Sequence, residues 1–373
     1  MNILVDGRPF IRSSAGISTV LRCVLETWAL QRKEDKLYVV MPKSMHESIA
    51  KYKFPDNVEF IYLKSFIWQN MPNLVSLNFV VPKLIRLLGI NVYFSPVPNL
   101  PVFIPKTITK VVFVHDVVNL EFIETMAFRN RLASSLFYNH SIKTSDVLWA
   151  NSRYTKERIE AYFPHRKCIN IFVGCAVDRS LYRELHLNPM EQSEVKRKYG
   201  IKNGFLLFVG SLEPRKNLPF LLSLMPEIYS KTGLQLVVVG AKGWKNSDIK
   251  QIVERENFPK DCTIFCGYVT NEDLVLLYNT ADSFVSTSLN EGFGLPQLEA
   301  LLCGCPVVTA KNSAMVEVAK NVEGAVLVEG YDKDTWIKKI TNHITNHPKV
   351  DTSSLQRYTW DTIIHNFLSS NFS

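Results

Sequence analysis

The sequence predicts a two-domain α/β protein in which each domain is built on a parallel, doubly wound sheet. The chain has 373 residues, too many for one ordinary domain, and 46% of them are hydrophobic, which is enough for two full cores. Short apolar runs of strand length alternate with stretches of helix length, as in βαβ units. A polar segment at residues 179–200 interrupts this alternation, which resumes at Phe205. We therefore expect a linker there between two similar domains.

In the first domain, candidate functional residues follow two of the predicted strands. The strands are expected at residues 3–5, 37–41, 58–62, 92–94, 111–114, 147–150 and 169–173. Gly16 is expected in the loop between the first strand and a helix that begins at Ile17. His115 and Asp116 end another strand, at the edge where open α/β sheets bind ligands. A lone histidine or glycine at such a position is also compatible with a structural role.

In the second domain, two adjacent cations stand between the first strand and its helix. The strands are expected at residues 205–210, 234–240, 263–269, 281–286 and 305–308. Arg215 provides a planar fork of donors and Lys216 a compact charge, so together they could bind a diphosphate. Cations at a helix start oppose the helix dipole, and this local penalty favours a functional role.

Residues 286–308 combine a loop, a helix start and two carboxylates between two predicted strands. Gly292 and Gly294 lack Cβ atoms, so their backbone N–H groups can approach a ligand closely. The helix expected to begin near Leu295 adds free N–H groups and a positive dipole end. Glu291 and Glu299 could contact two ends of one ligand, although either acid could also be an ordinary loop or helix-start residue.

Charge and cysteine content narrow the functional classes. Residues 1–175 contain 22 Lys and Arg and 13 Asp and Glu, a net charge of +9 (22 − 13). The remaining residues contain 21 Lys and Arg (43 − 22) and 22 Asp and Glu (35 − 13), a net charge of −1. The basic half suits a phosphorylated substrate, an anionic membrane surface or merely a soluble basic face. No nucleic-acid-binding motif is present, so nucleic acid is not an expected partner. Seven scattered cysteines indicate neither a disulfide framework nor a zinc site and favour the cytoplasm.

No membrane-spanning or signal segment is expected. The sequence from Met1 reaches Asp6 after only a few apolar residues, which is typical of a first strand and not of a signal peptide. The most apolar long segment, residues 66–90, is interrupted by two prolines and several amides, so it lacks the roughly 18 continuous apolar residues of a spanning helix.

One possible metal motif is present. Asp332 and Asp334 form a D-x-D pattern before a helical run. A helix N-cap followed by a first-turn acid explains this pattern without a metal, so no metal site is expected.

Three motifs carry a resemblance to a known family. Glu291 and Glu299 with the seven residues between them, in Glu-Gly-Phe-Gly-Leu-Pro-Gln-Leu-Glu-Ala, resemble the E-x7-E signature of retaining glycosyltransferases with the GT-B fold. The chain is most similar to family 4 of these enzymes, the glycosyl transferases group 1. Gly210 to Asn217 resembles the family's Gly-x5-Lys-Asn loop, and His115-Asp116 resembles its His-Asp motif. The resemblance covers essentially the whole chain.

The resemblance implies a fold of two facing Rossmann-like, doubly wound domains with a cleft between them. It implies an N-terminal acceptor domain at residues 1–178, a linker at 179–200, a C-terminal nucleotide-sugar donor domain at 201–350, and a last helix within 351–373 that crosses back to the first domain.

The resemblance also implies a role for each candidate residue. Glu291 and His115 would act near the donor sugar, Arg215 and Lys216 on its phosphates, and Glu299 on the ribose. Further donor contacts are implied for a set of mainly backbone positions: Gly16, Tyr268, Val269, Gly292, Phe293, Gly294 and Leu295. Tyr268 and Val269 are the candidates for base contact, and Gly16 for the diphosphate.

The implied activity is a metal-independent retaining transfer of a hexosyl group from a nucleoside-diphosphate sugar, with no cofactor. Family frequency suggests GDP-mannose as donor. The acceptor would be a lipid-linked saccharide of bacterial O-antigen or capsule synthesis, at the cytoplasmic face of the inner membrane. A non-catalytic protein of the same fold that binds nucleotide sugars or scaffolds a membrane assembly is the alternative.

Overall fold

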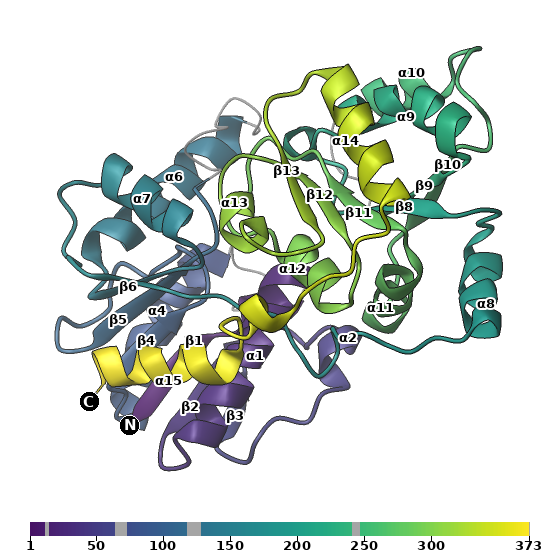
Figure 1. Cartoon of the computed structure of the whole chain (residues 1–373). Helices are drawn as coiled ribbons and strands as arrows, with labels where there is room; N and C mark the ends of the chain where they lie inside the picture. The colour runs from purple at the N-terminus through teal and green to yellow at the C-terminus, as the bar shows by residue number, and fades with distance from the viewer. Residues whose placement is uncertain (12–14, 64–72, 118–127, 241–246, 373) are drawn as a thin grey trace. The chain divides into compact units, whose positions relative to one another are not determined.

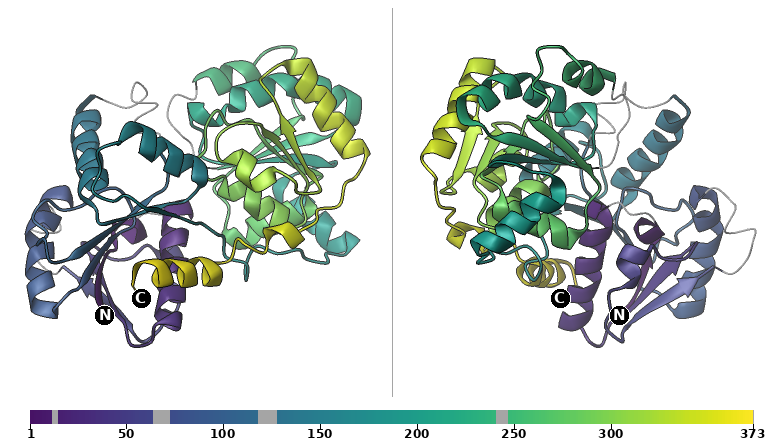
Figure 2. Two further views of the ribbon diagram at one scale, coloured as in Figure 1. Left: turned by 60° about the vertical axis from the view of Figure 1, so that its left-hand side comes forward. Right: turned by 90° about the vertical axis from the view of Figure 1, so that its right-hand side faces the viewer.

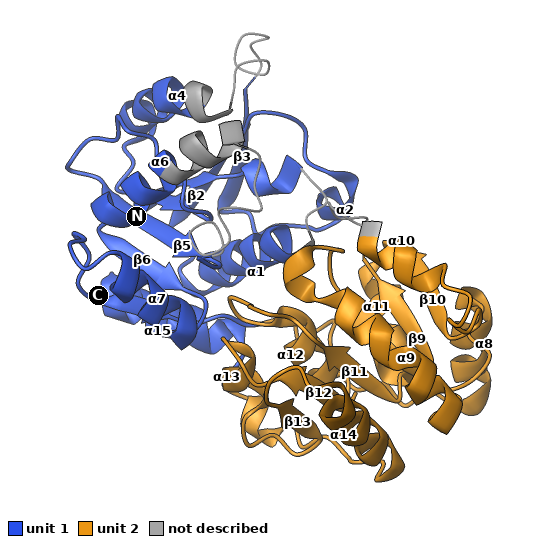
Figure 3. Cartoon of the chain, turned by 90° about the horizontal axis from the view of Figure 1, so that it is seen from above, with its two compact units in different colours: residues 1–176, 358–373 blue, residues 177–357 orange. Residues whose placement is uncertain are grey.

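The chain forms two compact units, each built on one parallel sheet. The computed structural model describes residues 1–11, 15–63, 73–117, 128–240 and 247–372 (Figure 1). Residues 1–176 and 358–373 form the first unit, and residues 177–357 form the second (Figure 3). Both sheets are wholly parallel in their pairings, as predicted. The predicted linker, residues 179–200, instead belongs to the second unit and carries α8 (Pro189–Tyr199), as do residues 351–357.

The sheet of the first unit has seven strands in the order β3-β2-β1-β4-β5-β6-β7. Their bounds are β1 (Asn2–Asp6), β2 (Lys36–Met41), β3 (Val58–Tyr62), β4 (Val92–Ser95), β5 (Thr109–Val114), β6 (Val147–Ala150) and β7 (Ile171–Val173). The order reverses between β1 and β4, which are paired in parallel. The predicted strands of this half agree with these within a few residues.

Helices cover both faces of this sheet because successive strand residues point to opposite sides. The described helices are η1 (Arg8–Ile11), α1 (Ala15–Gln31), α2 (Glu47–Ala50), α4 (Asn73–Leu88), α6 (Phe128–Thr144), α7 (Arg153–Tyr162) and α15 (Trp360–Asn371). Tyr93 and Leu148 join a core cluster with side chains of α4, α6 and α7. On the other face, Trp149 stacks on Phe367 of α15, which also lies against Trp28 of α1. The C-terminal helix therefore packs beside α1 (Figure 2).

The sheet of the second unit has six strands in the order β10-β9-β8-β11-β12-β13. Their bounds are β8 (Phe205–Val209), β9 (Gln235–Val239), β10 (Thr263–Gly267), β11 (Ser283–Ser286), β12 (Val307–Ala310) and β13 (Ala325–Val328). The last strand, β13, is additional to those predicted. The order reverses between β8 and β11, so this sheet also has a topological switch point.

Helices of the second unit again form two layers. They are η3 (Pro214–Lys216), α9 (Leu218–Thr232), α10 (Ser247–Val253), α11 (Asn271–Thr280), α12 (Leu295–Leu302), α13 (Met315–Ala319), α14 (Lys333–Thr345) and η4 (Ser353–Leu355). Apolar side chains of α9 and α14, including Leu221 and Trp336, pack with Phe208 and Val238 on one face. The helix α11 contacts α8 and α12. Among the residues described in both units, no helix is long and apolar enough to cross a membrane.

Candidate functional site

The candidate site of the second unit lies where β8 and β11 end. These strands are neighbours, although the chain continues from β8 to β9 on the other side. Parallel strands end at the same edge, and open α/β sheets bind ligands where the strand order reverses. The loop after β8 carries Arg215 and Lys216, and the loop after β11 carries Glu291. The fold thus brings together residues about 75 positions apart in the sequence.

Two glycines make room at this edge. A Cβ atom on Gly240, which follows β9, would lie 1.9 Å from the carbonyl oxygen of Gly210, which follows β8. The two backbones can therefore approach only because Gly240 has no side chain. A Cβ atom on Gly210 would lie 3.3 Å from Cε of Lys216. The lysine stem therefore crosses directly over Gly210.

Glu291 is ion-paired with both predicted cations. Its Oε1 lies 2.5 Å from Nζ of Lys216 and its Oε2 lies 3.0 Å from Nη1 of Arg215. Ser288 donates a hydrogen bond to the same Oε1 at 2.7 Å. Glu213 also accepts from Arg215 Nε at 2.9 Å. Because Lys216 and Glu291 are only 7% and 8% exposed, water screens their interaction weakly.

Electrostatics keep the Glu291 carboxylate ionised. Burial opposes the charge, but the charges of Lys216 and Arg215 and the hydrogen bonds from Lys216 and Ser288 outweigh it. Together they lower the pKa of Glu291 to about 2. The group is therefore a fixed negative charge over the ordinary pH range, held against two cations that could instead bind an anionic ligand.

The two loops are also joined through their backbones. The N–H group of Leu289 donates to the carbonyl oxygen of Arg215 at 2.7 Å. The Thr287 hydroxyl donates to the carbonyl oxygen of Asn217 at 3.0 Å. Asn217 has a left-handed backbone with φ of 51°, a conformation that asparagine tolerates better than most residues. These bonds set the position of the cations relative to Glu291.

A third loop, after β12, supports Glu291 from the other side. The backbone N–H of Glu291 donates to the hydroxyl oxygen of Ser313 at 3.0 Å. Asn312 and Tyr331 both donate to the carbonyl oxygen of Ser288, at 3.1 and 2.8 Å. These residues were not among the predicted site residues. In the sequence, Asn312 and Ser313 could have been recognised by their position just beyond a strand that neighbours β11.

The glycine-rich segment ends in the start of α12. Gly294 is the N-cap of this helix and has a left-handed backbone with φ of 89°, which suits glycine. The helix begins at Leu295, where it was predicted. Gly292 and Phe293 are buried, the phenyl ring being 4% exposed. This segment therefore lies directly between Glu291 and the first turn of α12.

Glu299 lies one turn into α12 and is held by tyrosine hydroxyls. Tyr278 of α11 donates to Glu299 Oε2 at 3.1 Å, and Tyr182 also hydrogen-bonds to this carboxyl group. Burial raises the pKa of Glu299 to about 7, although the two tyrosine bonds and the Lys216 charge act in the opposite direction. The Lys216 charge therefore acts on Glu299 as well as on Glu291.

Tyr268 and Val269 follow β10 at the same edge of the sheet. Tyr268 is 54% exposed, whereas Val269 is 9% exposed. Gly267 has a left-handed backbone with φ of 67°, and its carbonyl oxygen accepts a hydrogen bond from the N–H group of Gly240 at 2.8 Å. A base-contact role for residues 268 and 269 stays a prediction.

In the first unit, His115 directly follows β5, as predicted. Nε2 of His115 lies 2.9 Å from the carbonyl oxygen of Pro96, and the ring lies against Phe113 with centroids 4.5 Å apart. Burial lowers the pKa of His115 to about 4, although the Pro96 bond opposes this. A neutral imidazole must donate Nε2–H to that carbonyl, so Nδ1 is left as an acceptor.

Gly16 lies inside a helix, not in the preceding loop. The helix α1 begins at Ala15, one residue before Gly16. A Cβ atom at this exposed glycine would meet nothing within 4 Å. The predicted start at Ile17 was therefore two residues late, and no steric need for glycine is visible at this position.

The D-x-D pattern forms a helix start. Asp332 is the N-cap of α14 and accepts from the backbone N–H of Thr335 at 2.9 Å and from its hydroxyl at 2.6 Å. Asp334 lies in the first turn, as the capping interpretation predicted. Across the described parts of the chain, no three His, Cys, Asp or Glu side chains are grouped so that they could hold a metal ion.

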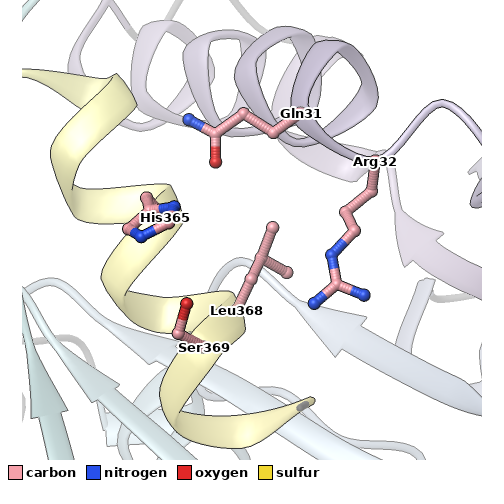
Figure 4. A pocket seen from close by; sticks show the side chains of 5 residues that line it. All are labelled: Gln31, Arg32, His365, Leu368 and Ser369. Atoms are coloured by element: carbon pink, nitrogen blue, oxygen red, sulfur yellow. The ribbon is translucent and has the colours of Figure 1, made fainter.

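A separate cavity of about 250 Å³ lies between α1 and α15 of the first unit. Its lining residues are Gln31, Arg32, His365, Leu368 and Ser369 (Figure 4). The helix α1 starts after the carboxyl end of β1, so its last turn lies toward the opposite edge of the sheet. This cavity is therefore on the side of the unit away from His115.

The second unit matches a known sequence family. Residues 191–355 match the family described as Glycosyl transferases group 1. Among curated proteins, the chain is 32% identical over 185 residues to O-antigen chain mannosyltransferase B of Escherichia coli, an alignment that covers 48% of this chain and 47% of that protein. The chain thus spans about half the length of this curated relative.

Solved structures match along the whole chain. Sucrose-phosphate synthase from Thermosynechococcus elongatus has a TM-score of 0.73 at 16% identity and covers 100% of this chain and 94% of its own. Anabaena Alr3699/HepE, solved in complex with UDP and glucose, has a TM-score of 0.71 at 17% identity and covers 99% of this chain and 98% of its own. At these identities the likeness concerns the fold, which is GT-B, as predicted.

Proposed function

We propose that this chain, in which residues 191–355 form a Glycosyl transferases group 1 domain, is a metal-independent retaining glycosyltransferase that uses a nucleoside-diphosphate sugar. The observation that carries the proposal is the grouping of Arg215, Lys216 and Glu291 at the switch point of the second sheet. Two cations beside a glycine-rich helix start suit the two phosphates of a nucleotide sugar. Glu299, one turn further along, would accept hydrogen bonds from the ribose hydroxyls.

The proposed reaction breaks the bond between the anomeric carbon of the hexose and the diphosphate oxygen. The acceptor hydroxyl oxygen forms the new bond on the same face, and its proton passes to the leaving phosphate. Arg215 and Lys216 would stabilise the charge that develops on the diphosphate. Glu291 would orient the hexose, and no covalent bond to the carboxylate is needed. His115, as a neutral side chain, would contact the sugar near the reacting carbon.

Donor and acceptor are proposed by analogy. Similarity to an O-antigen chain mannosyltransferase favours mannose, and GDP-mannose is the first donor to test. A lipid-linked saccharide of cell-surface polysaccharide synthesis is the proposed acceptor, at the cytoplasmic face of the inner membrane.

A panel of nucleotide sugars tests the proposal. The protein would be incubated with GDP-mannose, UDP-glucose, UDP-galactose, UDP-N-acetylglucosamine and a nucleotide-activated rhamnose, and release of nucleoside diphosphate would be measured. Slow hydrolysis or transfer with one donor supports an enzyme, and NMR of the product would give its anomeric configuration. Binding without any turnover would favour the alternative, a non-catalytic nucleotide-sugar-binding protein.

Chelation tests metal independence. We expect EDTA to leave turnover largely unchanged, because the charge of the leaving diphosphate would be met by Arg215, Lys216 and the start of α12. Turnover would be measured with EDTA and after addition of Mg²⁺ or Mn²⁺. Loss of activity that either ion restores would contradict the prediction and direct attention back to Asp332 and Asp334.

The first unit offers a basic and apolar surface for an anionic membrane. Four apolar side chains of α4 and of the loop after β4 are 50% to 68% exposed: Phe79, Leu87, Val102 and Phe103. The backbone N–H of Val102 donates to Asn78 of α4 at 2.6 Å, which brings the loop beside the helix. Exposed Lys83, Arg86 and Lys106 belong to the same segments. The sequence also favours membrane contact for Phe66, Ile67, Trp68 and Leu74 near Lys64. Of these, Leu74 lies in the first turn of α4, and the others lie outside the described residues.

We expect salt-sensitive binding to anionic liposomes. Each basic residue near such a surface contributes about 1 kcal/mol, so a few suffice for reversible binding. Binding should weaken as the Debye length falls from about 10 Å at 0.1 M salt to about 3 Å at 1 M salt. Sedimentation with neutral and anionic liposomes at both salt concentrations would measure this.

A matched pair of variants locates the membrane surface. Phe79→Ser with Phe103→Ser should weaken sedimentation, whereas Ile169→Ser, which removes an 80% exposed side chain elsewhere in the unit, should not. Equal binding to neutral liposomes, or no binding to either kind, would contradict the electrostatic proposal.

A further inference from the structure

The Glu299 carboxyl group is enclosed by two tyrosines from segments outside its own helix. Tyr278 comes from α11 and is 1% exposed. Tyr182 belongs to the second unit, precedes α8 in the chain and is 4% exposed. Tyr278 donates to Glu299 Oε2 at 3.1 Å, and Tyr182 forms a second hydrogen bond to the carboxyl group. Both hydroxyls therefore act on one half-buried acid.

The tyrosine hydroxyls are held in place by packing and backbone bonds. The rings of Tyr182 and Tyr278 meet edge to face with centroids 6.3 Å apart. Asn279, the next residue of α11, donates to the carbonyl oxygen of Arg183 at 3.2 Å and accepts from the N–H of Leu185 at 2.7 Å. These two bonds fasten the Tyr182 segment to α11. Side chains this buried and this constrained are preorganised, since they have few other rotamers to adopt.

We propose that Tyr182 and Tyr278 are positioning residues that hold the Glu299 carboxylate in the orientation in which it accepts hydrogen bonds from the ribose of the donor nucleotide. This inference rests on the proposed function, because it takes the ligand to be a nucleoside diphosphate. It adds that a segment predicted to be a linker completes the ribose site, and that recognition of ribose hydroxyls depends on two phenols that do not themselves contact the reacting atoms.

Charge explains why the phenols matter. The groups that act on Glu299 are Tyr278 of α11, Tyr182 of the neighbouring segment and Lys216 of the loop after β8, with Cys303, the C-cap of α12, nearby. Burial raises the pKa of Glu299 to about 7, and the two phenols and Lys216 keep it from rising further. Without a phenol, more of the carboxyl group is protonated at neutral pH. A protonated acid is a weaker acceptor for hydroxyl groups than a carboxylate.

Calorimetric titration with paired nucleotides tests the proposal. The wild-type protein would be titrated with GDP and UDP, and the one that binds more tightly would be compared with its 2′,3′-dideoxy analogue. In Tyr278→Phe and Tyr182→Phe, we expect the affinity for the ribonucleotide to fall about 10-fold at neutral pH, the loss expected when a charge-assisted bond becomes a neutral one. The affinity for the dideoxynucleotide should not change, because it lacks the hydroxyls that Glu299 would bind.

The pH dependence gives a second readout. The ratio of ribonucleotide affinity to dideoxynucleotide affinity should increase with pH as Glu299 ionises. In the tyrosine variants, this increase should occur at a higher pH than in the wild type. Raising the pH to about 8.5 should therefore restore part of the lost preference. Glu299→Gln should abolish both the preference and its pH dependence.

The matched control is Tyr229→Phe, which removes a phenol from α9. It should behave as the wild type does with both nucleotides. Two results would overturn the inference and leave the proposed function standing. Either the tyrosine variants lose affinity for both nucleotides equally, or they keep the wild-type affinity for both while the wild type prefers the ribonucleotide. A wild-type protein that binds neither GDP nor UDP would overturn the proposed function and this inference with it.

Discussion

Replacing Glu291 with glutamine is expected to reduce turnover by about 10²–10³-fold, the loss typical of removing one preorganised electrostatic group from an active site. Glutamine keeps the shape of the side chain but removes the charge that faces Lys216 and Arg215. The affinity for the nucleoside diphosphate should not fall, because those cations would no longer be neutralised by a carboxylate. A turnover number from the donor panel and a dissociation constant from calorimetry would separate the two effects.

The same variant should be less stable. Removing one partner of a buried ion pair costs about 3–5 kcal/mol, because the other charge is left buried without compensation. The glutamine amide oxygen can still accept a hydrogen bond from Lys216, so we expect a loss near the lower end of that range. The free energy of unfolding from urea titration would measure it.

The pH dependence of stability has a definite sign. The Glu291 pKa is lowered in the folded protein to about 2 from 4.5, so its stabilising contribution is fully present above about pH 4.5 and is lost as the pH falls toward 2. The wild type should therefore lose stability over this interval more steeply than Glu291→Gln. Equal slopes in the two proteins, together with unchanged turnover in the variant, would contradict the role proposed for Glu291.

Replacing either cation should have the second largest effect, on donor binding. Arg215→Ala and Lys216→Ala each remove a charge-assisted hydrogen-bond partner worth about 1.5–3 kcal/mol, which corresponds to about 10- to 150-fold in the dissociation constant of the donor. We expect the larger loss for Lys216, which is the more deeply buried of the two. Calorimetry with the nucleoside diphosphate and initial rates with the donor would measure both effects.

The matched control is Lys231→Ala, which removes an exposed lysine from a surface pair with Glu227 at 2.6 Å. Exposed pairs contribute about 0.2–1 kcal/mol to stability, and this one lies outside the site, so donor affinity should not change. If both site variants keep the affinity and rate of the wild type, the cations do not bind the diphosphate. If the control weakens binding as strongly as they do, the effect is one of net charge alone.

Most strands were predictable because each depends on the hydrophobic pattern of its own residues. Strands such as residues 205–209 are continuous apolar runs, since both faces of a parallel sheet are covered by helices. The strand β13 was not predicted because it is short and only half-buried over most of its length, so its apolar residues carry a weak signal. The end of the first domain was predicted at residue 178, within two residues of the unit boundary. The separate linker at residues 179–200 was not observed, because α8 packs on α11 and this packing leaves no mark in composition.

The sequence by itself determined which chemical groups are available: two cations at Arg215 and Lys216, two acids at Glu291 and Glu299, and a helix that must begin after Gly294. Local propensities and spacing suffice for these, since each depends on neighbours along the chain. Only the tertiary structure decided that Glu291 pairs with both cations, that Ser313 supports its backbone and that two phenols enclose Glu299. These contacts join residues many positions apart, and their energies arise from burial, which removes the water that would otherwise screen the charges.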